Sequence, residues 1–318
     1  MSRNSPRPLK VGLCLPITEG WCGPDTARWN DVKAMAQHAE AVGFDSLWVN
    51  DHLIFDLGAP GEAPAGGWES WSMLTALAAV TTRAEIGTFV TCTGFHNPAL
   101  LAKMADTVDE ISGGRLILGL GAGYHEPEFR AFGFPFDHLL GRFEESLQII
   151  HSLLRNGAVD FQGRFHAARD CELHPRGPTR GGPPIMIGPR PDRPRSLRLA
   201  AQYADYWNIF AVNQAEKLTP GMQALDAACA KAGRDPATVH RTVGLLIDLP
   251  GFESDPNGRG IARYRASRTP ATGTPEQLAE QLRAFARQGI GHVQLWLEPS
   301  TMAGIDAIAP VLELLDRG

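Results

Sequence analysis

Short apolar segments alternate with longer amphipathic segments along most of the chain. A buried strand is typically a run of about four to eight apolar residues, whereas a helix places apolar residues three or four positions apart. Strands are predicted on this basis at residues 9–16, 46–50, 85–92, 115–123, 184–187, 206–211, 241–249 and 292–298. Helices are predicted at residues 28–42, 71–81, 98–112, 142–155, 195–203, 216–232, 275–288 and 305–315.

The helix predicted at residues 98–112 carries signals at both of its ends. Asn97 can accept hydrogen bonds from the first free amides, and Pro98 suits the first helical position. Gly113 can adopt the left-handed conformation that ends a helix. We therefore expect this helix to begin and end at these positions.

Each predicted strand is followed by a helix, and the alternation breaks at residues 156–183 and 250–272, which are rich in Gly, Pro and Arg. Eight strand–helix repeats are typical of a (β/α)8 TIM barrel, which commonly exceeds about 250 residues. The fold class predicted is therefore α/β. Residues 1–318 are expected to form one barrel domain, with insertions after the fourth and seventh strand units.

Composition and charge narrow the class of protein. Hydrophobic residues make up 43% and charged residues 20%, as in a packed globular chain, and the net charge of −5 does not favour nucleic acid or an anionic membrane. The chain has neither a long apolar run nor a leader-like start, so a cytoplasmic protein is expected. Five scattered cysteines predict neither a disulfide framework nor a zinc site.

The active site of a TIM barrel lies where its strands end. Three histidines follow neighbouring predicted strands here: His52, His96 and His125. A single histidine at such a place is often structural, whereas three on one rim are also consistent with a catalytic site, so both interpretations stay open. Asp51 and Glu126 would add metal-ligand types to this rim, although no close ligand spacing such as HxH is present.

Two glycine-containing loops suggest phosphate or ring binding. Residues 188–195 (GPRPDRPR) carry three arginines into a helix N-terminus, which suits an anionic group, although an ordinary solvated loop has the same composition. Residues 119–123 (GLGAG) could let a planar ring approach the backbone, although the full dinucleotide-binding motif is absent. Cys92, Trp48 and Trp207 are interpreted as buried packing residues.

Several segments of the chain resemble the bacterial luciferase-like flavin-dependent oxidoreductases. They are AEAVGFDSLWVNDHL (39–53), residues 86–136 around TCTGFHNP and GLGAGYHEPEF, PPIMIGPRPDRPRSLRLAAQYADYWN (183–208) and TGTPEQLAEQL (272–282). The resemblance covers nearly the whole chain in order. It implies a (β/α)8 barrel that binds reduced FMN and uses O2 as a monooxygenase, or binds the deazaflavin coenzyme F420 for hydride transfer.

The chain lacks the larger lid insertions of many FMN-using members, so the resemblance favours coenzyme F420 and hydride transfer with a small organic substrate. The alternative is an FMN-dependent monooxygenase served by a separate flavin reductase. A homodimer is expected from the resemblance. A non-catalytic flavin-binding protein and a metal-dependent barrel hydrolase are the remaining alternatives.

The resemblance also assigns roles to individual residues. The predicted catalytic residues are His52, Asp51 and Tyr124, since a histidine can give or accept a proton near neutral pH. The predicted cofactor-binding residues are Thr88, Phe89 and Val90 at a bulge with a non-prolyl cis peptide, Gly121, Ala122, Gly123 and Tyr124 along strand four, and Gly188, Pro189, Arg190 and Arg193 around the phosphate.

Three departures from the family pattern concern the substrate and the phosphate loop. Tyr124 stands where some F420-dependent sugar phosphate dehydrogenases have a glutamate, and residues 53–57 lack their tryptophan. A sugar phosphate substrate is therefore not expected. In addition, Pro189 replaces a glycine of the phosphate loop and removes one amide donor.

Overall fold

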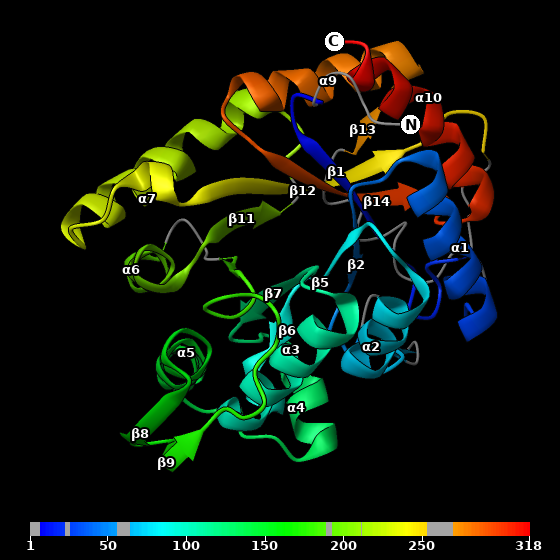
Figure 1. Cartoon of the computed structure of the whole chain (residues 1–318). Helices are drawn as coiled ribbons and strands as arrows, with labels where there is room; N and C mark the ends of the chain where they lie inside the picture. Colours follow the sequence, from blue (N-terminus) through cyan, green and yellow to red (C-terminus); the bar gives the residue numbers. More distant parts are fainter. Residues whose placement is uncertain (1–6, 23–25, 56–63, 189–192, 211, 253–269) are drawn as a thin grey trace.

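In the computed structural model of the chain, the described residues are 7–22, 26–55, 64–188, 193–210, 212–252 and 270–318. At the centre of the structure, eight parallel strands form a closed barrel (Figure 1). They are β1 (Lys10–Cys14), β2 (Ser46–Val49), β5 (Glu85–Thr88), β7 (Leu116–Gly121), β10 (Ile185–Ile187), β11 (Tyr206–Phe210), β12 (His240–Asp248) and β14 (His292–Glu298). The ring closes because β1 pairs with both β2 and β14 and β10 pairs with both β7 and β11. The predicted (β/α)8 barrel is confirmed.

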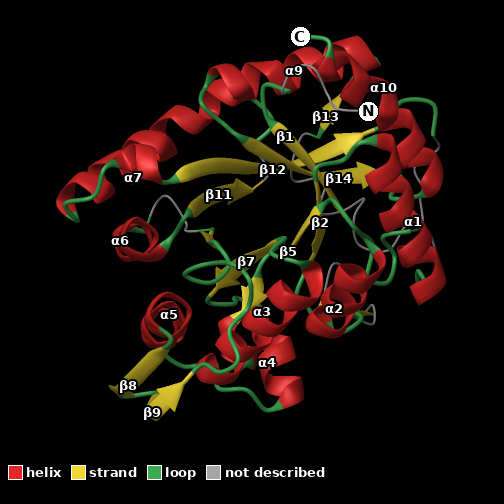
Figure 2. Cartoon of the chain, in the orientation of Figure 1, coloured by secondary structure: helices red, strands yellow, loops and turns green. Residues whose placement is uncertain are grey.

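Helices surround the strands, as Figure 2 shows by colour. They are α1 (Trp29–Val42), α2 (Ser70–Val80), α3 (Pro98–Ser112), α5 (Leu139–Asn156), α6 (Pro194–Tyr203), α7 (Thr219–Lys231), α9 (Pro275–Arg287) and α10 (Met302–Asp316). Helix α3 has the predicted ends: the Asn97 side chain accepts from two backbone amides, and Gly113 has φ +68°. Within the described residues, no helix is long and apolar enough to cross a membrane.

Several short elements differ from the sequence prediction. The strand predicted at 85–92 is divided into β5 and β6 (Thr91–Cys92), and the helix predicted at 142–155 starts earlier, at Leu139. Helix α4 (Glu126–Phe132) and the antiparallel pair β8 (Ala158–Gln162) and β9 (Ala167–Glu172) were not predicted. These elements are short, and β8 has no fully buried face, so the apolar pattern on which the prediction depends is weak there.

The inside of the barrel is filled by side chains. One buried cluster lies there: Cys14, Trp48, Ile117, Met186, Leu246 and Trp296. Phe89 adds an aromatic contact, since its ring centre lies 4.4 Å from that of Trp296. Gly244 gives these rings room, because a Cβ atom there would lie 2.9 Å from both Phe89 and Trp296. A ligand is therefore expected at the mouth of the barrel, where the strands end.

A buried polar group closes the opposite end, which we call the floor of the barrel. The Trp48 indole donates to Ser46 Oγ at 2.7 Å, and the same oxygen lies 2.7 Å from His292 Nε2. His292 is only 2% exposed, and burial lowers the pKa of its imidazole to about 3. Ser46 and His292 are the first residues of β2 and β14, so this group lies at the N-terminal ends of the strands.

Candidate functional site

The mouth of the barrel brings together two of the predicted catalytic residues. His52 follows β2 and Tyr124 follows β7, and the Tyr124 hydroxyl lies 3.4 Å from His52 Nε2. Their ring centres are 5.6 Å apart, and the Phe55 ring lies 4.3 Å from the imidazole on another side. Tyr124 is 65% exposed, so this pair can meet a ligand that enters from solvent.

A carboxylate that the sequence analysis did not identify holds the other side of the His52 ring. Glu128 Oε1 lies 3.1 Å from His52 Nδ1, and Glu128 Oε2 accepts from the backbone amide of Leu53 at 3.1 Å. Glu128 lies on α4 and is 1% exposed. The signal that could have revealed it is Glu126-Pro127-Glu128, a helix start placed directly after the end of a predicted strand.

Asp51 points to a different part of the mouth from His52. Its Oδ2 atom accepts from the backbone amide of Cys92 at 2.8 Å and lies 3.7 Å from His96 Nε2. Asp51 is 4% exposed. Its geometry is that of a residue that positions the end of β6. Burial, together with the nearby Asp51 charge, raises the pKa of the Cys92 thiol well above its usual range, so this cysteine is not set up as a nucleophile.

The predicted bulge after β5 contains the expected cis peptide, between Phe89 and Val90. The Thr88 hydroxyl donates to the Gly119 carbonyl at 2.9 Å and accepts from Thr91 at 2.8 Å, so it is engaged inside the protein. Phe89 packs in the barrel interior, and Val90 packs against β7. Thr88 is fully buried, whereas Phe89 and Val90 are partly exposed.

The turn after β7 is shaped by close packing. Gly123 has φ +77°, and a Cβ atom there would lie 2.5 Å from Cys92 Sγ. A Cβ atom at Gly121 would lie 2.8 Å from Val90 Cγ2, and Ala122 packs against the main core. Contacts within the protein therefore explain both glycines, and this turn places Tyr124 beside His52.

The predicted phosphate loop is described only in part, because Pro189 and Arg190 lie outside the described residues. Gly188 is exposed at the end of β10, and a Cβ atom there would meet nothing closer than the Asn208 carbonyl at 3.7 Å. Arg193 directly precedes α6. Arg195, from the same arginine-rich segment, is already paired with Glu144 at 2.6 Å.

Several buried polar atoms on segments at the mouth lack a hydrogen-bond partner within the described part of the chain, among them Asn50 Oδ1, Trp21 Nε1 and His96 Nε2. Asn50 follows β2 and donates through Nδ2 to Thr18 Oγ1 at 2.9 Å. Trp21 packs against the cluster inside the barrel. Asn50 Oδ1 is an acceptor and Trp21 Nε1 is a donor, and buried groups of this kind normally have partners. A flavin ring edge offers both donors and acceptors, so these residues fit a flavin-type ring.

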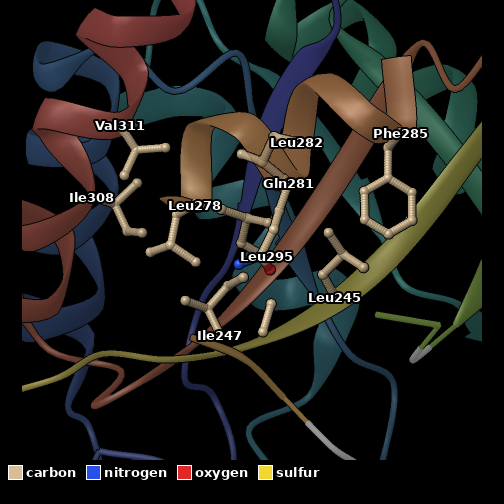
Figure 3. Close-up of a pocket in the computed structure, with 10 residues that line it drawn as sticks. Leu245, Ile247, Leu278, Gln281, Leu282, Phe285, Leu295, Ile308 and Val311 are labelled. Atoms are coloured by element: carbon tan, nitrogen blue, oxygen red, sulfur yellow. The ribbon is translucent and has the colours of Figure 1, made fainter. Parts of the chain in front are cut away.

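Among the residues that the structure describes, no three His, Cys, Asp or Glu side chains are grouped to hold a metal ion. A cavity of about 10 Å³ lies outside the barrel, where side chains of β12, β14, α9 and α10 meet (Figure 3). It has room for about one water molecule and cannot hold a flavin.

Comparison with known proteins agrees with the fold. Residues 9–247 match the family of luciferase-like monooxygenases. The pyrimidine monooxygenase RutA of Stutzerimonas stutzeri is 33% identical over 265 residues, which cover 79% of this chain and 70% of that protein. RutA of Rhizobium rhizogenes is 32% identical over 241 residues, which cover 71% of this chain and 64% of that protein. The matched region thus spans about two thirds of these relatives.

Solved structures share the fold at lower sequence identity. An F420-dependent secondary alcohol dehydrogenase in complex with an F420–acetone adduct has a TM-score of 0.78 and 19% identity, covering 96% of this chain and 99% of that chain. The monooxygenase RslO1 from Streptomyces bottropensis has a TM-score of 0.74 and 20% identity, covering 97% and 98%. At these identities the similarity concerns the fold alone.

The barrel fold and the family match together identify a TIM-barrel oxidoreductase. The chain belongs to the luciferase-like monooxygenase family and is a flavin-dependent enzyme.

Proposed function

We propose that the protein is a monooxygenase that binds reduced FMN and uses O2 to oxygenate a small organic substrate at the mouth of the barrel. The observation that supports FMN over coenzyme F420 is the sequence identity of 33% over 79% of the chain with a pyrimidine monooxygenase. The F420-dependent structural relatives reach only 17% to 19%. The sequence analysis favoured coenzyme F420 because the chain lacks large lid insertions. We therefore propose its alternative, an FMN-dependent monooxygenase, instead.

The names of the RutA relatives suggest the substrate to test first, a pyrimidine such as uracil. A monooxygenase that releases oxidised FMN needs a separate flavin reductase to supply the reduced form, and we include such a partner in the proposal. A homodimer and a cytoplasmic location are also proposed, on the family resemblance alone.

Bound reduced FMN would supply the two electrons with which one atom of O2 becomes water while the other enters the substrate. The chain itself would contribute positioning and proton transfer. His52 and Tyr124 form the hydrogen-bonded pair that can hold or move a proton at the mouth. Asp51 would keep the end of β6 in place, and Gly188 and Arg193 would lie near the phosphate.

The cofactor is tested by titrating the purified apoprotein with FMN and, separately, with coenzyme F420, following the quenching of cofactor fluorescence. We expect FMN to bind more tightly. Tight binding of F420 alone would contradict the proposal and return the protein to hydride transfer without O2.

The reaction is tested by adding a flavin reductase, NADH and FMN and following O2 consumption with and without uracil. We expect the substrate to increase O2 consumption and one labelled atom of ¹⁸O2 to appear in the product by mass spectrometry. The control is the same mixture without the protein, since free reduced FMN also consumes O2. Substrate oxidation without label would exclude a monooxygenase.

A further inference from the structure

We propose that Glu128 is a positioning residue that fixes the tautomer and orientation of His52, with the proton on Nδ1 and with Nε2 facing Tyr124. The role of this pair in turnover rests on the proposed function. The tautomer itself does not, because it follows from contacts within the protein.

The contacts of Glu128 determine which imidazole nitrogen carries the proton. A carboxylate can only accept hydrogen bonds. One oxygen of Glu128 accepts from the Leu53 amide, and the other lies 3.1 Å from His52 Nδ1. Nδ1 must therefore be the donor, since an unprotonated nitrogen would place two acceptors in contact at a buried site.

The opposite nitrogen then becomes the functional end of the ring. In a neutral imidazole with a proton on Nδ1, Nε2 is an acceptor, and it lies 3.4 Å from the exposed Tyr124 hydroxyl. The phenol can donate to Nε2, which gives the mouth one fixed hydrogen-bond direction from Tyr124 to His52 to Glu128. With the opposite tautomer, Nε2 could not receive a proton from Tyr124 or from a ligand.

The packing of α4 holds the carboxylate in place. Phe129, the next residue, is fully buried, and its ring centre lies 4.9 Å from Phe95 and 5.2 Å from Phe136. Glu128 is itself buried and holds the backbone of Leu53, the residue after His52. Orientation of a general base by a third group is a common arrangement in enzymes that use histidine for proton transfer.

The substitution Glu128→Gln tests this arrangement because an amide has one acceptor and one donor end. The Leu53 amide needs an acceptor, so the Gln oxygen should take that position and its NH2 group should face His52 Nδ1. We therefore expect the histidine proton to move from Nδ1 to Nε2. Glu126→Gln is the matched control, since it makes the same change at an exposed position two residues earlier on α4.

The measurement is ¹⁵N NMR of histidine-labelled apoprotein, with the His52 signals assigned by their loss in His52→Gln. We expect a protonated Nδ1 in the wild type and in Glu126→Gln, and an unprotonated Nδ1 in Glu128→Gln. A wild-type Nδ1 without a proton would overturn the proposal, and this spectrum decides even if the variant does not fold. An unchanged proton on Nδ1 in a folded Glu128→Gln would also overturn it.

Turnover gives a second readout, with the flavin bound. We expect Glu128→Gln to lower kcat by about 10- to 100-fold, with little change in KM or FMN affinity, as is common when the partner that orients a functional histidine is lost. Glu126→Gln should retain full activity. If the NMR result holds but the wild type oxygenates nothing, the proposed function fails and the positioning role stands.

Discussion

Two histidines near opposite ends of the same barrel have contrasting surroundings. His292, in the floor, is 2% exposed and contacts the neutral hydroxyl of Ser46. His52, at the mouth, lies between a buried carboxylate and an exposed phenol. Burial, together with the nearby Lys10 charge, lowers the pKa of His292 to about 3, which keeps the ring neutral at physiological pH.

The comparison shows how one fold separates structural from functional histidines. A neutral ring enclosed on all sides can only pack and accept or donate a fixed hydrogen bond. A ring that is oriented by a carboxylate on one side and open toward a ligand on the other can exchange protons. The floor and the mouth should therefore respond differently to substitution.

The largest expected effect concerns a glycine between the two ends. A Cβ atom at Gly119 would overlap the backbone oxygen of Thr88, which cannot move without breaking the bulge after β5. We expect Gly119→Ala to lower the free energy of unfolding by about 3 kcal/mol or more. The measurement is urea denaturation followed by circular dichroism. Gly188→Ala is the control and should cost less than about 0.5 kcal/mol, because its Cβ has room.

At the mouth, we expect His52→Ala to reduce turnover by about 100-fold or more while FMN affinity and stability stay close to those of the wild type. The reason is that the substitution removes the group that holds the proton without altering the barrel. Steady-state kinetics and fluorescence titration measure the two quantities. Unchanged turnover would show that His52 has no catalytic role. The contrast between a functional histidine at the mouth and a structural one in the floor would then be wrong.

In the floor, His292 should make stability depend on pH. Its folded pKa of about 3 is below the unfolded value of about 6.5, so between these values the unfolded chain binds a proton that the folded protein does not. The stability contributed by the neutral ring is complete above pH 6.5 and is lost as pH falls toward 3, by about 1.4 kcal/mol per pH unit. The free energy of unfolding should be measured by denaturation at pH 7.5, 6 and 5. Its slope against pH should be smaller in His292→Gln than in the wild type, by the equivalent of up to one proton.

A slope that is identical in the wild type and in His292→Gln would mean that His292 does not differ in proton binding between the folded and unfolded chain. The contrast between the two histidines would then rest on geometry alone. The free energies of unfolding at pH 7.5 provide the reference, since His292 should be mostly neutral there in both the folded and the unfolded chain.

The smallest effect is expected at Gly188. Alanine there should leave stability unchanged but weaken FMN binding by about 3- to 10-fold, because the added methyl group would occupy space where we propose the phosphate to lie. Comparison of FMN with riboflavin, which lacks the phosphate, tests the location. An equal loss of affinity for both compounds would place the phosphate elsewhere.

Much of the fold was predictable because it depends on local pattern. The eight strand–helix units, the ends of α3, the buried Trp48 and Trp207 and the position of the bulge with its cis peptide are confirmed. The position of His52 and Tyr124 at the ends of their strands followed from the barrel. Pro189 and Arg190 lie outside the described residues, so their role stays a prediction.

The partners of these residues were not predictable in the same way. Glu128 is 76 positions from His52, and His292 is 246 positions from Ser46. No periodicity connects such pairs, because their contact depends on which strands become neighbours when the barrel closes. The short helix α4 was missed because its apolar pattern is too brief to identify, and packing of Phe129 against other rings stabilises it.

The sequence by itself determined the alternation of strands and helices, the barrel that follows from it and the family to which the chain belongs, since these depend on residue spacing and on motifs contiguous in the chain. Only the tertiary structure decided that Asp51 turns toward Cys92, that Glu128 holds His52 and that His292 is buried against the Ser46 hydroxyl. Hydrogen-bond direction and burial are properties of atoms brought together by barrel closure.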